Sequence, residues 1–218
     1  STVSLEGVGL ITNDSTQSYR IRNQLLKEDE KYTELTRIQD DLRQALLHSL
    51  KSFINTYEGN VLSSDWEQKY CGFEKKPVEI LASKPGQIVL HPFPSWKYNH
   101  SLYHEDPDKR GDERSRVIFM LKKHLYSSGL LDNISINEGG KTSIVITLKH
   151  VNKAFALKYL LDKTPLSTHI TYMGDEVYPN GNDMPIVNLI QELAALNPTF
   201  SRLSVLALNS NPASVPSN

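Results

Sequence analysis

The sequence is poor in several features that whole classes of protein require. Its single cysteine, Cys71, cannot form an intramolecular disulfide or a cysteine zinc site, which indicates a reducing compartment. With 24 basic and 25 acidic residues the formal net charge is −1, which excludes nucleic-acid binding driven by bulk charge. No apolar run approaches the roughly 18 residues that span a bilayer, and Ser1–Glu6 lacks the pattern of a secretory leader. We therefore expect a cytoplasmic protein with neither a nucleic-acid nor a membrane partner.

What remains is the composition of an ordinary folded chain. The 218 residues are 39% hydrophobic and 22% charged, enough for a real core in one or two domains. The periodicity of the apolar residues divides the chain into two regions of different character.

The region 31–149 has the pattern of an α+β unit. Apolar residues three and four apart predict an amphipathic helix from Tyr32 to Tyr57, and a second helix over 113–127. Between them, two short β patterns at 78–81 and 87–90 flank Lys84-Pro85-Gly86 and predict a hairpin, followed by a loop over 91–112. Two further strands are predicted at 133–137 and 142–148. We expect one sheet with two helices on one face.

The last third alternates differently. A helix over 152–161, a buried strand over 169–173, a helix over 185–195 and an apolar run over 203–208 give an αβαβ order. This order is typical of a parallel sheet, so the predicted fold class is α/β.

A glycine-broken acidic loop follows the 169–173 strand. After Gly174, its acidic and carboxamide side chains include Asp175, Asn182 and Asp183. Open α/β sheets bind ligands at the carboxyl ends of their strands. Two interpretations stay open, because such carboxylates either ligate a hard cation such as Mg²⁺ or cap the next helix, for which Asp183 is well placed.

Lys153 opens the helix that precedes this strand. A lysine in a first helical turn is most often a solvated surface charge. The helix dipole disfavours a cation there, however, so a purely structural reason for this lysine is weak. It is therefore also a candidate for holding an anion.

Taken together, Lys153 and the motif Gly174-Asp175…Gly181-Asn182-Asp183 resemble the third and fourth motifs of the haloacid dehalogenase (HAD) superfamily. The Pro179-x-Gly181-Asn182-Asp183 form is most similar to the phosphomannomutase branch and its Cof-type sugar-phosphate phosphatase relatives with a C2-type cap. The resemblance implies the C-terminal part of a HAD-like Rossmannoid core over 1–30 and 150–218, with an α+β cap inserted at 31–149.

The resemblance also implies roles for individual residues. Asp175 would be a Mg²⁺ ligand, and Lys153 would contact the phosphoryl group and the nucleophile. Asp183 would be a water-mediated metal ligand or an anchor for Lys153, while Gly174 and Asn182 would position the loop. The implied activity is Mg²⁺-dependent hydrolysis of a small phosphorylated metabolite, a sugar phosphate by class.

The chain departs from the family at the first motif. The Asp-x-Asp-x-Thr loop with the nucleophilic aspartate is missing, and the nearest string, Thr12-Asn13-Asp14-Ser15-Thr16, is interpreted as a chance turn before the cap. On this resemblance the nucleophile would come from an upstream segment or a second chain, and the incomplete sheet would leave an exposed face. The alternative is an inactive relative that serves as a binding or interaction module. Turnover by this chain alone is not expected.

Substrate choice would come from the cap. Lys84 and Lys97 could bind an anion there, although a lysine lacks the bidentate fork of the arginine that the mutase branch carries. Trp96 could stack on a sugar ring or simply pack its loop onto the cap.

Overall fold

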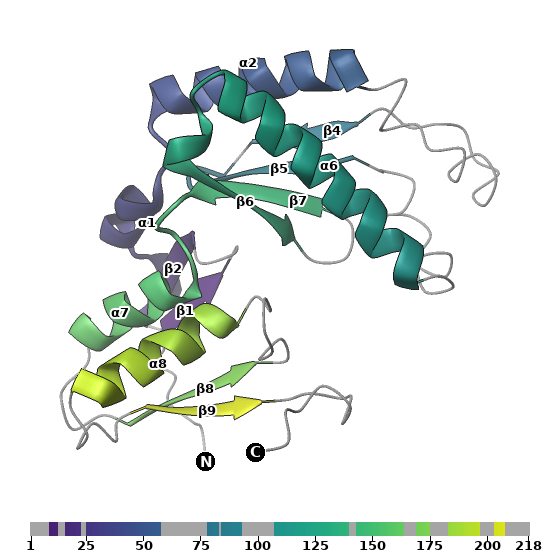
Figure 1. Cartoon of the computed structure of the whole chain (residues 1–218). Helices are drawn as coiled ribbons and strands as arrows, with labels where there is room; N and C mark the ends of the chain where they lie inside the picture. Colours follow the sequence, from purple (N-terminus) through teal and green to yellow (C-terminus); the bar gives the residue numbers. More distant parts are fainter. Residues whose placement is uncertain are drawn as a thin grey trace. The chain divides into compact units, whose positions relative to one another are not determined.

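The chain folds into two compact units, Ser1–His150 and Val151–Asn218 (Figure 1). The computed structural model describes residues 9–12, 16–22, 25–57, 78–82, 84–92, 107–139, 143–163, 169–174, 183–196 and 203–207. Helices and strands occur in both units, which confirms the mixed α/β class. The finer division into a core of 1–30 and 150–218 and a cap of 31–149 stays a prediction.

The first unit begins with a three-stranded antiparallel sheet that sequence reasoning found only in part. Its strands follow one another as β1 (Gly9–Thr12), β2 (Gln17–Arg22) and β3 (Leu25–Glu28). Thr12 of β1 lies opposite Gln17 of β2, and residues 13–15, where the chance turn was predicted, lie outside the described residues. β3 was missed because every one of its side chains is exposed, so it has no buried face for an alternating pattern to mark.

The helix predicted over 32–57 is two helices. They are α1 (Glu30–Thr36) and α2 (Asp40–Tyr57). The break arises because the amide of Ile38 donates to the carbonyl of Pro85, 3.0 Å away, while Arg37 adopts an extended backbone. Ile38 is nevertheless fully buried, so the apolar spacing continues across a break that it does not reveal.

A four-stranded antiparallel sheet forms the centre of the first unit. Its order is β4 (Glu79–Leu81), β5 (Gln87–His91), β7 (Ser143–Leu148) and β6 (Ile134–Gly139). Both predicted hairpin patterns are confirmed, and η1 (Leu131–Asn133) leads into β6. Figure 1 shows α2 and α6 (Pro107–Ser127) over the same face of this sheet, as the sequence predicted.

The hydrophobic core lies between this sheet and its two helices. Ile88, Ile146 and Ile136 lie opposite one another on three neighbouring strands and are nearly or fully buried. They face apolar side chains of the helices, namely Leu46, Leu50 and Phe53 of α2 and Val117, Leu121 and Leu125 of α6. Strand alternation and helical spacing thus meet in one core.

Helix α6 starts at Pro107, inside the segment 91–112 that was expected to be loop. Proline suits the first position of a helix, since its φ is already helical and the amide hydrogen it lacks would have had no intrahelical partner. The prolines and charges of this segment are typical of a loop, so the sequence predicts a later start, at Glu113.

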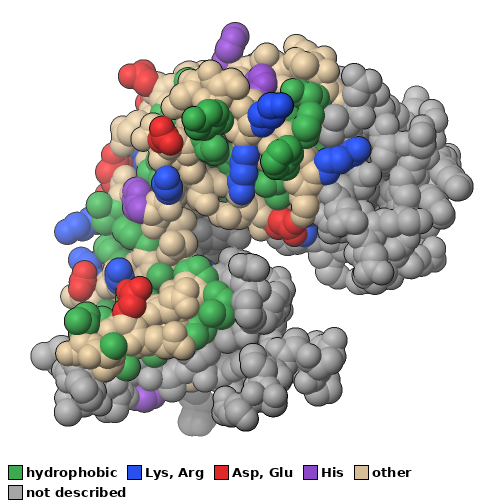
Figure 2. All heavy atoms as spheres, in the orientation of Figure 1, with side chains coloured by type: hydrophobic (Ala, Val, Ile, Leu, Met, Phe, Trp, Pro, Cys, Tyr) green, Lys and Arg blue, Asp and Glu red, His purple; other side chains and the backbone are tan. Residues whose placement is uncertain are grey.

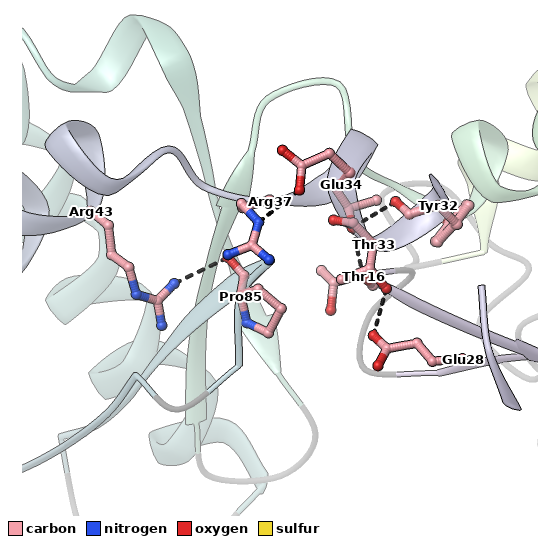
Figure 3. Close-up of polar contacts among 9 residues, drawn as sticks. Thr16, Glu28, Tyr32, Thr33, Glu34, Arg37, Arg43 and Pro85 are labelled. Atoms are coloured by element: carbon pink, nitrogen blue, oxygen red, sulfur yellow. Dashed lines mark hydrogen bonds and ion pairs between the residues drawn. The ribbon is translucent and has the colours of Figure 1, made fainter. Parts of the chain in front are cut away.

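Arg43 of α2 forms hydrogen bonds to the turn between β4 and β5. Its guanidinium donates to the carbonyls of Lys84 at 2.7 Å and Pro85 at 3.1 Å, and also to that of Ala82. Figure 3 shows the Arg43 side chain extending to Pro85, near the ion pair of Arg37 with Glu34. Burial lowers the pKa of the Arg43 guanidinium, and the nearby Asp40 carboxylate raises it.

The same turn also meets the start of the chain. The fully buried Thr36 hydroxyl donates to the carbonyl of Thr16 at 2.6 Å. Gly86 packs so closely here that a Cβ would lie 2.7 Å from the Cβ of Thr16 and 3.1 Å from the carbonyl oxygen of Thr36. Only glycine allows the three segments to meet.

The second unit has the predicted αβαβ order. Its elements are α7 (Lys153–Lys163), β8 (Ile170–Gly174), α8 (Met184–Leu196) and β9 (Leu203–Ala207). β8 and β9 pair in parallel, with Ile170 opposite Leu203. Leu157, Ile186 and Leu189 form a small core against which Ile170 and Tyr172 pack.

The prediction that this first strand is buried is wrong for one of its faces. Ile170 and Tyr172 face α7 and α8, whereas Thr171 and Met173 point the other way, and Met173 is 60% exposed. The cause is that both described helices of this unit pack on the same side of β8. Over the described part of the chain, no helix is long and apolar enough to cross a membrane.

We predict that Arg43→Met lowers the free energy of unfolding by about 2 kcal/mol, because three carbonyls lose a charged donor. The control is Arg37→Met, whose exposed pair with Glu34 contributes below about 0.5 kcal/mol. Urea unfolding of both variants measures the difference. Equal losses would show that Arg43 does not fasten the turn.

Candidate active site

Three elements of the second unit bring their ends to one carboxylate. Lys153 is the first residue of α7, Gly174 the last of β8, and Asp183 directly precedes α8. The Lys153 ammonium forms an ion pair with Oδ1 of Asp183. The Tyr172 hydroxyl donates to the same oxygen at 2.5 Å. Oδ1 of Asp183, at the start of α8, therefore contacts Lys153 at the start of α7 and Tyr172 near the end of β8.

Burial makes this carboxylate unusual. The Asp183 side chain is 1% exposed, whereas that of Lys153 is 28% exposed. A buried carboxylate is costly unless charged or polar donors replace its water, and Lys153 and Tyr172 are such donors. The Lys153 ammonium thus combines a buried anchor with partial access to solvent.

The local sequence explains how Lys153 comes to its position. Asn152 caps α7, since its side-chain oxygen accepts from the amide of Phe155 at 2.9 Å. Lys153 consequently lies at the positive end of the helix dipole, where a cation is disfavoured. The Asp183 carboxylate compensates for that unfavourable placement. This contact explains why a lysine stands at the start of α7, which the sequence alone did not explain.

Asp183 makes contacts through its backbone and through its side chain, and both interpretations of its loop stay open. Its backbone carbonyl accepts from the amide of Ile186 at 3.1 Å in the first turn of α8. Its side chain contacts Lys153 and Tyr172 across the unit. The residue begins a helix and also holds the lysine.

Gly174 is required by close approach. A Cβ there would lie 2.8 Å from Cγ of Asp183 and 2.8 Å from Cε1 of Tyr172, and closer still to the second carboxylate oxygen. Any larger residue would push the carboxylate away from the end of β8. This gives a physical reason for the glycine of the motif.

Tyr172 is the residue of this site that the sequence analysis missed. It lies two positions before Gly174, on the same side of β8, because strand side chains alternate. That spacing was a usable signal. What it could not reveal was the contact between the phenol and Asp183, which depends on how α8 packs.

The other predicted site residues are distributed differently. Asp175 and Asn182 lie outside the described residues, as do Trp96 and Lys97. Lys84 lies on the β4–β5 turn in the first unit, where its carbonyl accepts from Arg43. Of the second-unit predictions, the structure brings Lys153, Gly174 and Asp183 together.

The described residues offer a ligand of the type that a hard cation prefers, but not a set of ligands. Asp183 offers carboxylate oxygen, which Mg²⁺ prefers. Its Oδ1 already accepts from Lys153 and Tyr172, so its contacts are those of an anchor. Among the residues that the structure describes, no group of three His, Cys, Asp or Glu side chains is placed to hold a metal ion.

Comparisons with known proteins give distant structural likenesses. No family model and no curated protein sequence matches the chain. The chain is similar to trehalose-6-phosphate phosphatase of Aspergillus fumigatus, with TM-score 0.48 and 10% identity over 94% of this chain and 62% of that one. It is also similar to IMP-nucleotidase of Plasmodium falciparum, with TM-score 0.47 and 16% identity over 94% of this chain and 40% of that one.

A third likeness is to the sucrose-phosphatase of Synechocystis sp. PCC6803, with TM-score 0.40 and 16% identity over 92% of this chain and 68% of that one. The chain spans about three fifths of the length of the trehalose-6-phosphate phosphatase. No family assignment follows from likeness at this level.

We predict that Gly174→Ala destabilises the chain by about 1–3 kcal/mol, since the added methyl group overlaps the Asp183 carboxylate and the Tyr172 ring. The matched control is Met173→Ala on the exposed face of the same strand. Thermal and urea unfolding measure both. A Gly174→Ala chain as stable as the Met173→Ala chain would contradict the close packing.

Proposed function

We propose that the chain is the lysine-bearing and cap-bearing part of a Mg²⁺-dependent phosphatase of the haloacid dehalogenase type. The observation that carries the proposal is the Lys153–Asp183 ion pair at the carboxyl end of β8. The motif order supports it, since the lysine precedes Gly174-Asp175 and Asn182-Asp183 in the sequence. The substrate class is a small phosphorylated metabolite, and within it a sugar phosphate.

Lys153 would supply positive charge to the transferring phosphoryl group. Its ammonium is held on one side by the buried Asp183, yet the side chain is 28% exposed. A lysine fixed in this way needs no reorganisation when negative charge develops nearby, which is how preorganised charges lower a barrier. Tyr172 and Gly174 would act as positioning residues, because both constrain the Asp183 carboxylate.

Mg²⁺, when bound, would neutralise charge on the phosphoryl oxygens. Asp175 follows Gly174 directly and would be the carboxylate of this chain that ligates it. Asn182 would orient the loop, and Asp183 would act mainly through Lys153.

The reaction would proceed in two balanced halves. An aspartate carboxylate from an upstream segment or a second chain attacks phosphorus, the ester P–O bond breaks, and the leaving oxygen takes a proton from a general acid. Water then cleaves the aspartyl-phosphate and releases inorganic phosphate. This chain contributes charge and positioning to both halves.

The first unit would bear on substrate choice. Lys84, Lys97 and Trp96 are the proposed cap contacts for an anionic, ring-containing substrate. The cytoplasmic location and the absence of nucleic-acid and membrane partners belong to this proposal too, on the single-cysteine and net-charge arguments.

One observation favours a second candidate. The 218 residues contain no Asp-x-Asp-x-Thr motif after an apolar strand. A relative without its nucleophile could retain the fold and the anion site as a binding module. The two candidates differ in turnover by the natural gene product.

The test is release of inorganic phosphate from sugar phosphates and an aryl phosphate, with Mg²⁺ or with chelator. We predict no release by this chain alone, because the attacking carboxylate is missing. The natural gene product is predicted to turn over only with Mg²⁺, and Asp175→Asn is predicted to lower its kcat by about 10²-fold or more. The matched control, Asp162→Asn on an exposed position of α7, should leave kcat unchanged.

One outcome would contradict the enzyme proposal, and another would contradict the role of Asp175. A gene product with no turnover that still binds inorganic phosphate would favour the binding module. Full activity in the Asp175→Asn protein would remove that residue from the site.

A further inference from the structure

Two buried oxygen atoms of the four-stranded sheet are left without a hydrogen bond. Gln87 of β5 is 4% exposed and Thr147 of β7 is 2% exposed. Within the part of the chain that the structure describes, neither Oε1 of Gln87 nor Oγ1 of Thr147 has a hydrogen-bond partner. A buried polar atom without a partner destabilises a folded chain, so these two oxygens need an explanation other than packing.

The sheet register brings the two side chains together. Gln87 lies directly opposite Thr147, and Ile88 lies opposite Ile146. Opposite residues on neighbouring antiparallel strands have Cβ atoms about 4.5–5.5 Å apart. Because the two isoleucines pack in the core against α2 and α6, Gln87 and Thr147 point to the other face of the sheet. Both oxygens are therefore within reach of one small molecule.

The polar residues continue onto the next strand. Ser135 of β6 lies opposite Thr147, and its hydroxyl accepts from Nδ2 of Asn137 at 3.0 Å. Ser135 is partly exposed and Asn137 is exposed. The set Gln87, Thr147 and Ser135, called the polar row below, thus has a buried end at β5 and an end at β6 that solvent reaches.

The chemistry of the polar row favours a neutral hydroxyl group. None of its three side chains is charged, so the row offers an ion no counterion. Oε1 of Gln87 only accepts hydrogen bonds, whereas the Thr147 hydroxyl both donates and accepts. One ligand hydroxyl can donate to Gln87 and accept from Thr147. The next positions on this face are apolar, since Val89 lies opposite Val145.

We propose that the polar row binds the hydroxyl groups of a neutral sugar ring. The hydroxyls would pair with Gln87 and Thr147, and the ring carbons would lie against Val89 and Val145. Small-molecule sites combine an apolar lining with a few polar groups in this way. The proposal does not depend on the phosphatase proposal, because all of these residues belong to the first unit and none belongs to the candidate active site.

The other face of the sheet offers no comparable pair. It is covered by α2 and α6, and Figure 2 shows hydrophobic and basic side chains side by side on the outer surface there. Ser49 of α2 has a buried hydroxyl without a partner in the described residues. It lies on a helix, away from the polar row, and therefore provides a matched control.

The first part of the test measures stability. Gln87→Met and Thr147→Val each remove an unpartnered polar atom while keeping a similar side-chain shape. We expect each substitution to raise the Tm of the free chain by about 2–4 °C and to abolish sugar binding. A gain in stability coupled to a loss of binding is typical of polar groups that are retained for a ligand. The control, Ser49→Ala, should leave sugar binding unchanged.

The second part measures binding by the unmodified chain. The probes are D-glucose, D-mannose and D-galactose, titrated while amide resonances are recorded. We expect at least one sugar to bind with a Kd of about 1–10 mM and to shift resonances of β5, β6 and β7. Tetrahydropyran, the same ring without hydroxyl groups, should cause no shift. Sugar binding by a chain that releases no phosphate would leave this inference intact while the phosphatase proposal fails.

Three results would overturn the inference. One is the absence of resonance shifts with all three sugars at about 100 mM, well above the expected Kd. Another is undiminished sugar binding by both Gln87→Met and Thr147→Val. The third is a chain that binds no sugar and gains no stability from either substitution, which would assign the two oxygens to a single ordered water molecule.

Discussion

The second unit depends on one buried carboxylate. Asp183 is removed from water, so it requires donors, and Lys153 begins a helix at an end that disfavours a cation. The opposite charges of Lys153 and Asp183 compensate each other, and the Tyr172 hydroxyl donates to the same oxygen, Oδ1 of Asp183. Because these residues come from α7, β8 and α8, the contact determines where the ends of all three elements lie. The close packing at Gly174 follows from it.

The consequence for function is a fixed ammonium beside the end of a parallel strand. Carboxyl ends of parallel strands are where open α/β sheets bind ligands. The first unit contributes a different kind of structure, an antiparallel sheet covered by α2 and α6. Its core uses the inner face of α6 completely and leaves the outer face to solvent.

Sequence reasoning succeeded where a local pattern fixes the structure. The β pattern over 142–148 predicted β7, and the apolar run over 169–173 before Gly174 predicted β8. It failed where a distant partner decides. The break between α1 and α2 depends on the carbonyl of Pro85, and the role of Tyr172 depends on its contact with Asp183. The exposed face of β8 was missed because the side of the sheet on which helices pack is a property of the whole unit.

The most direct test of this account is a double-mutant cycle between Lys153 and Asp183, measured by urea unfolding of the whole chain. Lys153→Met, Asp183→Asn and the double variant are compared with the unmodified chain. The account predicts that the two single variants together lose about 1–3 kcal/mol more unfolding free energy than the double variant, since the two side chains compensate each other. Losses that add to within about 0.5 kcal/mol would contradict it, because Asp183 would then be held by something other than Lys153.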